Sequence, residues 1–167
     1  MNASLSDCNV QQFQNEIAVY LRDGLMKAGI SATGHDLNDF FYYHQQALMA
    51  YETGRQKQPT FWSYAFDQYR TDFILQHAMQ TFPVRFLCRP ELEILRAYDQ
   101  AHSSMLEETL RCYLTNERAL LHTAELMDIH RTTLLYRIRR IEELTGLQLD
   151  DEQTRFDLLL SFHLIFQ

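Results

Sequence analysis

The sequence predicts a mainly α-helical protein that begins with a small α+β part and continues as helices only. Apolar residues recur at helical spacing along most of the chain, whereas short apolar runs suited to strands occur only before Asp67. Gly and Pro residues mark the ends of several of these segments. With 167 residues, 46% of them apolar, the chain can form one packed domain or two small ones.

The N-terminal part begins with a predicted helix, a short strand and a second helix. Periodic apolar residues place the first helix over 13–28, where the glycine that follows would end it. A short apolar run predicts a strand over 30–32. The second helix is expected over 37–51, capped by Asp36 and closed by Gly54.

A second strand and a third helix complete this part. The polar stretch 55–58 precedes Pro59 and predicts a loop. Aromatic residues over 61–66 suit a strand, whose partner so short a segment does not determine. The alternation of helices and strands resembles part of an α/β layer. A helix over 67–82 is expected to end at Pro83.

From Pro90 onward the sequence predicts helices only. Pro90 and the glutamate after it suit a first helical turn. Ser104 lies three residues before Glu107, which is the spacing of a capping box at the start of a helix. Asn116 is a candidate N-cap for the short helices that follow. The terminal helix is expected to begin near Asp150, whose spacing to a glutamine again fits a capping box.

Charge is distributed unevenly along the chain. The formal net charge is −7, from 15 basic and 22 acidic residues, whereas binding to a polyanion normally requires a basic surface. The ten positions 131–140 nevertheless contain four arginines and no acidic residue. Acidic residues precede and follow this stretch. We therefore expect a single basic edge, with weak attraction for nucleic acid elsewhere.

The segment 119–146, ALLHTAELMDIHRTTLLYRIRRIEELTG, has the pattern of a helix-turn-helix. Small Ala124 suits the close approach of two helices. Asp128 lies in the tight connection and tolerates a left-handed backbone conformation, and Ile129 would fill the corner. The second helix has one apolar side, formed by Leu134, Ile138, Ile141 and Thr145.

The opposite side of this second helix is polar and largely basic, which suits contact with double-stranded DNA. Recognition helices present their N-terminal residues to base edges in the major groove. His130, Arg131, Thr132 and Thr133 occupy this tip. We therefore assign a base contact to Arg131, a base-edge, thymine-methyl or phosphate contact to Thr132 and Thr133, a base or phosphate contact to Tyr136, and phosphate contacts to Arg137, Arg139 and Arg140. Two alternatives remain from the pattern alone: a solvated arginine face, and a dimerisation or interaction module for an acidic protein partner.

The stretches ETLRCYL and HTAELMDIHRTTLLYRIRRIEELTGLQLDD closely resemble the C-terminal helix-turn-helix domain of the PucR and CdaR family of bacterial regulators. The turn and HRTTL also resemble Fis-type DNA-binding proteins. The resemblance covers residues 105–166 and implies a sequence-specific transcriptional regulator whose helix enters the major groove. Thr132 stands where the family usually has Asn, which could alter base preference. Glu117 and Arg118 replace a usually small, polar loop.

Upstream, AGISATGHDLNDFFYYHQQALMAYETG resembles the second half of the degenerate GGDEF-like domain of the same family. This resemblance implies a partial GGDEF-like domain over 1–82, a helical connector over 83–103 and the helix-turn-helix domain over 104–167. No GG(D/E)EF motif is present, so cyclase activity is not implied. The sensory domain and its effector, which the sequence does not identify, would lie upstream.

No catalytic, metal or cofactor site is predicted, and an enzyme is not expected. The seven histidines include no pair at i and i+4. Three well-separated cysteines, Cys8, Cys88 and Cys112, form no metal or disulfide pattern and are expected to be reduced thiols. Adjacent carboxylates diverge on a helix, and no Gly-rich phosphate loop occurs.

Two further expectations concern location and assembly. No signal peptide or run of eighteen apolar residues is present, so we expect a cytoplasmic protein without a membrane partner. The terminal helix is apolar almost all round and should be buried. Packing within its own domain or in a two-fold homodimer would bury it, and a dimer would match paired DNA half-sites.

Overall fold

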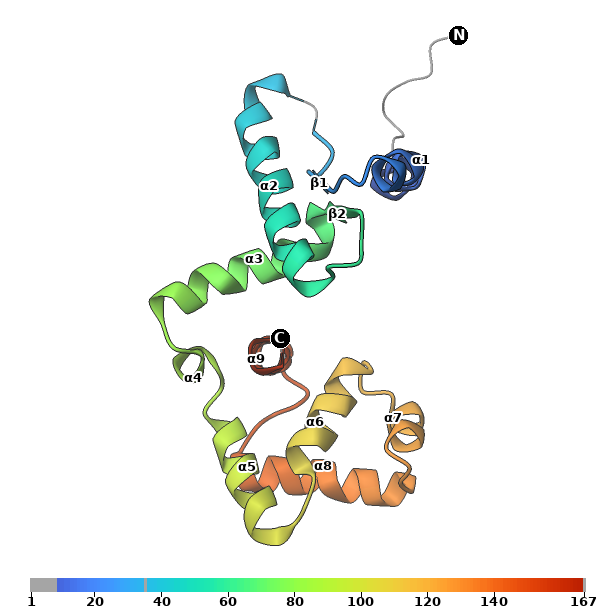
Figure 1. Cartoon of the computed structure of the whole chain (residues 1–167). Coiled ribbons are helices and arrows are strands. Elements are labelled where there is room, and N and C mark those ends of the chain that lie inside the picture. The colour runs from blue at the N-terminus through green and yellow to red at the C-terminus, as the bar shows by residue number, and fades with distance from the viewer. Residues whose placement is uncertain (1–8, 35, 167) are drawn as a thin grey trace. The chain divides into compact units, whose positions relative to one another are not determined.

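The computed structural model describes residues 9–34 and 36–166 and confirms the mainly helical prediction (Figure 1). The chain divides into two compact units, Met1–Ala78 and Met79–Gln167. The only strands in the described ranges lie in the first unit. No helix among the described residues is long and apolar enough to cross a membrane.

The N-terminal unit is built around a β-α-β arrangement. Strand β1 pairs in parallel with β2, with Gly29 opposite Tyr64, and α2 connects the two strands. This pairing supplies the partner that the sequence left open and confirms an α/β layer. The elements are α1 (Val10–Asp23), β1 (Ala28–Ile30), the 3-10 helix η2 (Leu37–Asp39), α2 (Phe40–Lys57), β2 (Ser63–Ala65) and α3 (Phe66–Thr81).

The first helix ends earlier than predicted, and Gly29, the predicted stop, lies instead in strand β1. Helix α1 ends at Asp23, with Gly24 as its C-cap, and Ala28 and Gly29 belong to β1. A Cβ atom at Gly29 would lie 1.8 Å from the Ala47 carbonyl oxygen of α2. The missing side chain thus lets α2 lie against the strand, which a one-dimensional pattern does not reveal.

Helix α2 continues past Gly54 to Lys57, so the predicted stop and most of the predicted loop are wrong. A Cβ atom at Gly54 would lie 2.2 Å from the ring of Tyr64. Tyr64 is fully buried, and its hydroxyl donates to the carbonyl oxygens of Gln58 and Phe61. Gly54 therefore makes room for Tyr64 and does not end the helix. The predicted cap Asp36 is confirmed, since its side chain accepts from the Asn38 N–H at the start of η2.

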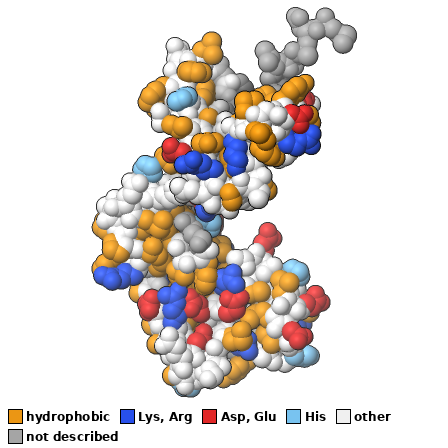
Figure 2. Space-filling model, in the orientation of Figure 1, with side chains coloured by type: hydrophobic (Ala, Val, Ile, Leu, Met, Phe, Trp, Pro, Cys, Tyr) orange, Lys and Arg blue, Asp and Glu red, His pale blue; other side chains and the backbone are white. Residues whose placement is uncertain are grey.

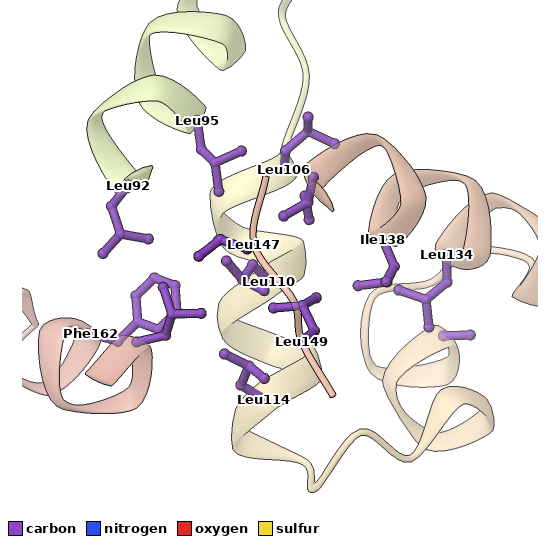
Figure 3. Packing of buried hydrophobic residues seen from close by; sticks show 13 residues of the cluster. Leu92, Leu95, Leu106, Leu110, Leu114, Leu134, Ile138, Leu147, Leu149 and Phe162 are labelled. Atoms are coloured by element: carbon purple, nitrogen blue, oxygen red, sulfur yellow. The ribbon is translucent and has the colours of Figure 1, made fainter. Parts of the chain in front are cut away.

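The C-terminal unit is entirely helical within its described residues. Its core joins α5, α6, α7, α8 and α9 and the segment between the last two (Figure 3). The helices are α4 (Val84–Leu87), α5 (Glu91–His102), α6 (Leu106–Thr115), α7 (Leu120–Leu126), α8 (Arg131–Thr145) and α9 (Glu152–Ile165). The buried core residues are Leu92, Leu95, Leu106, Leu110, Leu114, Ala124, Leu134, Ile138, Ile141, Leu147, Leu149, Leu158 and Phe162.

The start of α6 is capped by Asp99 of α5, so the predicted capping box is wrong. The Asp99 carboxylate accepts from the backbone N–H groups of Leu106 and Glu107, at 2.8 and 2.9 Å. Ser104 donates to the same carboxylate, and Glu107 pairs instead with Arg96. The carboxylate of Asp99, rather than the hydroxyl of Ser104, accepts from the first N–H groups of α6, because the turn brings α5 beside the first turn of α6.

Two other predicted caps are also displaced. Asn116 is the C-cap of α6, and its side chain donates to the Cys112 carbonyl oxygen, whereas the N-cap of α7 is Ala119. The N-cap of α9 is Asp151, which accepts from the Thr154 N–H at 2.7 Å. The preceding Asp150 accepts from Arg118.

Helix α9 buries only one of its sides. Leu158, Ser161, Phe162 and Leu164 are buried, while the Ser161 hydroxyl accepts from the Arg89 N–H and donates to the Asp157 carbonyl oxygen. Leu160 and Ile165 are half-buried, and three large apolar residues of the helix and its end, Phe156, Leu159 and Phe166, are exposed. The expectation that this helix is buried all round therefore holds for one side only within this chain.

Candidate nucleic-acid interface

Helices α7 and α8 and the turn between them form a helix-turn-helix, as predicted. Ala124 of α7 is buried where the two helices approach, and its carbonyl oxygen accepts from the Ile129 N–H. The Ile129 side chain packs against the core. Asp128 has a φ of 52°, which confirms the left-handed residue in the turn. These contacts set the direction in which α8 leaves the turn.

The inner side of α8 holds it on the core, leaving the other side to solvent. Leu134 and Ile141 are fully buried and Ile138 nearly so. The helix ends at Gly146, whose φ of 72° lies in the left-handed region that favours glycine. The outer residues His130, Arg131, Thr132, Thr133, Tyr136 and Arg139 are all exposed.

The N-terminal tip of α8 is closed by His130. Its Nδ1 accepts from the Thr132 N–H and lies 2.8 Å from the Thr132 hydroxyl oxygen. Neighbouring Arg131 is exposed and forms no hydrogen bond or ion pair with another described residue. The tip therefore presents an ordered imidazole beside a free guanidinium group.

Two of the four arginines are held by other helices. Arg137 is half-buried and its Nη1 donates to the hydroxyl of Thr109 on α6, at 3.1 Å. Arg140 donates to Glu143 at 3.1 Å, and its guanidinium lies 5.3 Å from the centre of the Tyr98 ring. Hydrogen bonds to Tyr98 and then Glu143 raise the pKa of Arg140 above its ordinary value.

Arg139 and Tyr136 contrast with these arginines. Arg139 is exposed and makes no hydrogen bond or ion pair within the described ranges, and the Tyr136 side chain is 66% exposed. At 100° per residue, Arg137 lies about 60° from Leu134, on the flank of the apolar side. This angle could have indicated from the sequence that Arg137 contacts the rest of the domain and does not face solvent alone. Nothing in the sequence pointed to Thr109 or Tyr98 as partners of the arginines.

Comparison with known proteins agrees with this geometry. Residues 106–164, which run from the start of α6 into α9, match the family model of the PucR C-terminal helix-turn-helix domain. The chain therefore carries a PucR-type helix-turn-helix domain. No solved structure matches the chain significantly.

Curated relatives of this PucR-type chain are named as transcriptional regulators. The chain is 40% identical over 75 residues to the proline-responsive transcriptional activator PutR of Bacillus subtilis, a match that covers 45% of this chain and 18% of PutR. It is 30% identical over 145 residues to the transcriptional activator PmfR of Paenarthrobacter nicotinovorans, covering 81% of this chain and 27% of PmfR.

A third relative extends the match through most of both units. Identity to the purine catabolism regulatory protein of Bacillus subtilis is 27% over 158 residues, covering 93% of this chain and 29% of that protein. The chain thus spans less than a third of the length of each of these three relatives.

The charge around the tip of the PucR-type domain is mixed. A shallow hollow between α7 and α8 is lined by Glu125 and Asp128 as well as by His130 and Arg131. On the face shown in Figure 2, basic and acidic side chains alternate over the C-terminal unit, without one broad basic surface. On this face, attraction for a polyanion would come from individual exposed arginines rather than from a broad basic surface.

The PucR-type domain offers no arrangement suited to metal binding among its described residues, where no three His, Cys, Asp or Glu residues come together. Cys88 and Cys112 are free thiols, and burial raises the pKa of each. A raised pKa lowers the thiolate fraction and hence the nucleophilicity of both residues. Cys8 lies outside the described residues.

Proposed function

We propose that this chain is the DNA-binding part of a transcriptional regulator and that α8 enters the major groove of double-stranded DNA. The observation that carries this proposal is the exposed tip of α8, set on a fully packed inner side. Leu134 and Ile141 hold the helix on the core, while His130, Arg131 and Thr133 remain free to meet a base edge.

The names of the relatives support the same role. PutR and PmfR are named transcriptional activators. Since this chain spans less than a third of either protein, regulation of transcription by the whole protein is part of the proposal. The effector and the regulated genes are not assigned.

The contacts divide by position along α8. Base edges are assigned to His130, Arg131, Thr132 and Thr133, and a base or phosphate to Tyr136. Arg139 is assigned to a phosphate, as a free cation two turns from the tip. Arg137 and Arg140 are also assigned to phosphates. Each would have to share its guanidinium with Thr109 or with Glu143, which accept from it in the free protein.

A homodimer forms the second part of the proposal. Phe156, Leu159 and Phe166 leave α9 with an exposed apolar side, and two copies would present two recognition helices to paired half-sites. Sedimentation velocity with and without duplex DNA tests this part. A single monomeric species at high concentration, together with one chain per duplex on DNA, would refute the dimer for this chain.

Fluorescence anisotropy with duplexes selected from a random pool tests DNA binding. The logarithm of affinity should fall linearly with the logarithm of salt concentration, by roughly 0.9 for each neutralised phosphate. Arg139→Ala should lower this slope by about one unit. Arg22→Ala is the matched control, because it removes the same charge from the exposed side of α1. An affinity that does not respond to salt, or equal slopes for the two variants, would contradict the proposal.

A further inference from the structure

The side chain of His130 is tied to its own helix by one edge only. Nδ1 lies 3.4 Å from the Thr132 backbone nitrogen, with the N–H directed at it, and 2.8 Å from the Thr132 hydroxyl oxygen. Nε2 forms no hydrogen bond with another described residue, although Glu125 and Asp128 line the same hollow. One nitrogen is therefore committed and the other is available.

The committed nitrogen determines where the imidazole proton lies. A backbone N–H can only donate, so the nitrogen that it points to must supply a lone pair. Nδ1 of His130 therefore carries no proton, and the proton of the neutral ring is on Nε2.

The same contact sets the direction of the Thr132 hydroxyl hydrogen. In this tautomer the single Nδ1 lone pair is shared between the Thr132 N–H, at 3.4 Å, and the Thr132 hydroxyl, which donates its hydrogen at 2.8 Å. Thr132 itself is exposed. The two residues then present a donor at His130 Nε2 and an acceptor at Thr132 Oγ1.

We propose that His130 is a specificity-determining residue that donates from Nε2 to the N7 atom of a purine in the major groove. Thr132 acts as the positioning residue that selects the tautomer. Both purines present an N7 acceptor in that groove and pyrimidines do not, so this contact selects purine over pyrimidine at one position of each half-site. The inference rests on the proposed DNA-binding function and deepens it.

The experiment scans a selected duplex with purine analogues in which N7 is replaced by carbon, one position at a time. For the unmodified protein, one position in each half-site should lose about fivefold in affinity, which corresponds to one hydrogen bond of about 1 kcal/mol. His130→Ser keeps an N-cap oxygen on the helix but has no donor at the position of Nε2. This variant should bind the natural and analogue duplexes equally at that position.

Arg131→Ala is the matched variant, because it alters the adjacent side chain and should retain the sensitivity at the His130 position. A loss that persists unchanged in His130→Ser, or no sensitive position at all, would overturn the inference. If the unmodified protein binds every duplex without salt dependence or not at all, the proposed function fails together with it.

A long-range proton–nitrogen NMR spectrum of the free protein provides a readout that does not depend on DNA. It should show His130 protonated at Nε2 and not at Nδ1, and Thr132→Val should retain this preference, because the backbone N–H that selects the tautomer remains. A proton on Nδ1 in the unmodified protein would refute the tautomer assignment.

Discussion

The arginines of α8 differ in how free they are, and this difference predicts different effects on DNA binding. Arg131 is exposed at the tip, whereas Arg139 is exposed more than two turns along the helix. Arg131→Ala should cost roughly 1 to 3 kcal/mol on a selected site and much less on random DNA. Arg139→Ala should weaken binding to both duplexes similarly. Anisotropy titrations on both duplexes at several salt concentrations measure these effects.

Thermal unfolding provides the control for these variants. Neither Arg131 nor Arg139 has a hydrogen-bond partner among the described residues, so neither substitution should change the melting temperature appreciably. Arg137→Ala should lower it, because the contact with buried Thr109 is lost. Equal losses on selected and random DNA for Arg131→Ala would show that the tip does not read bases.

Thr123 is a candidate for stabilisation by a single substitution. It is fully buried in α7, and its hydroxyl oxygen has no hydrogen-bond partner within the described residues. Thr123→Val keeps the shape and removes the cost of burying an unpaired hydroxyl, so we expect about 1 kcal/mol of added stability. Urea unfolding measures it. Thr123→Ser is the control, since it keeps the hydroxyl and loses a methyl group; stabilisation by Ser, or destabilisation by Val, would argue for a hidden partner.

Among the helices, α6 depends on a cap that comes from its neighbour. Asp99 accepts from two backbone N–H groups of α6 and from the Ser104 hydroxyl. Asp99→Ala should therefore cost roughly 1 to 3 kcal/mol, because these donors lose their acceptor at once. Asp99→Asn, which retains one acceptor oxygen, should cost less. Denaturant unfolding gives both values.

Ser104→Ala is the companion variant for the cap. If the predicted capping box existed, this substitution would cost as much as Asp99→Ala. In the observed arrangement it removes one donor to a carboxylate that retains two others, so its effect should be the smallest of the three. A Ser104→Ala loss equal to that of Asp99→Ala would contradict the cap described above.

At the scale of the C-terminal unit, the ion pairs of Arg89, which lies between α4 and α5, predict how stability depends on pH. Burial raises the pKa of Glu91, but the hydrogen bonds and charge of Arg89 outweigh burial and lower the pKa below 4.5. Arg89 also lies 3.6 Å from Asp157 of α9. A carboxylate whose folded pKa is lowered stabilises the fold above its unfolded pKa, and this contribution is lost as pH falls through the folded pKa.

The free energy of unfolding should therefore decrease as the pH is lowered below about 4.5, and Glu91→Gln should reduce this decrease. Urea titrations from neutral pH to about pH 3 measure the dependence. Glu93→Gln is the control, because this carboxylate is largely exposed and pairs with Arg96 three residues along the same helix. An identical pH dependence in unmodified protein and Glu91→Gln would show that this pair does not contribute.

Local signals in the sequence were sufficient for much of the C-terminal unit. The apolar spacing of Leu134, Ile138 and Ile141 predicted the buried side of α8, and Asp128 marked the left-handed turn. Both features arise from residues close together in the chain: a helix has a fixed period, and few residues tolerate a positive φ. The assignment of individual residues to DNA remains a prediction.

Tertiary structure decided the features that join residues far apart in the sequence. Glycine commonly ends a helix, so Gly29 and Gly54 were predicted as helix stops. Each instead leaves space for a neighbouring group, the backbone of α2 at Gly29 and the Tyr64 ring at Gly54, whose position the sequence pattern does not give. Asp99, rather than Ser104, caps α6, and Thr109 holds Arg137, because chain folding brings these groups within hydrogen-bond distance. A periodic pattern identifies the residues that face inward, but only the packed structure determines which groups they meet.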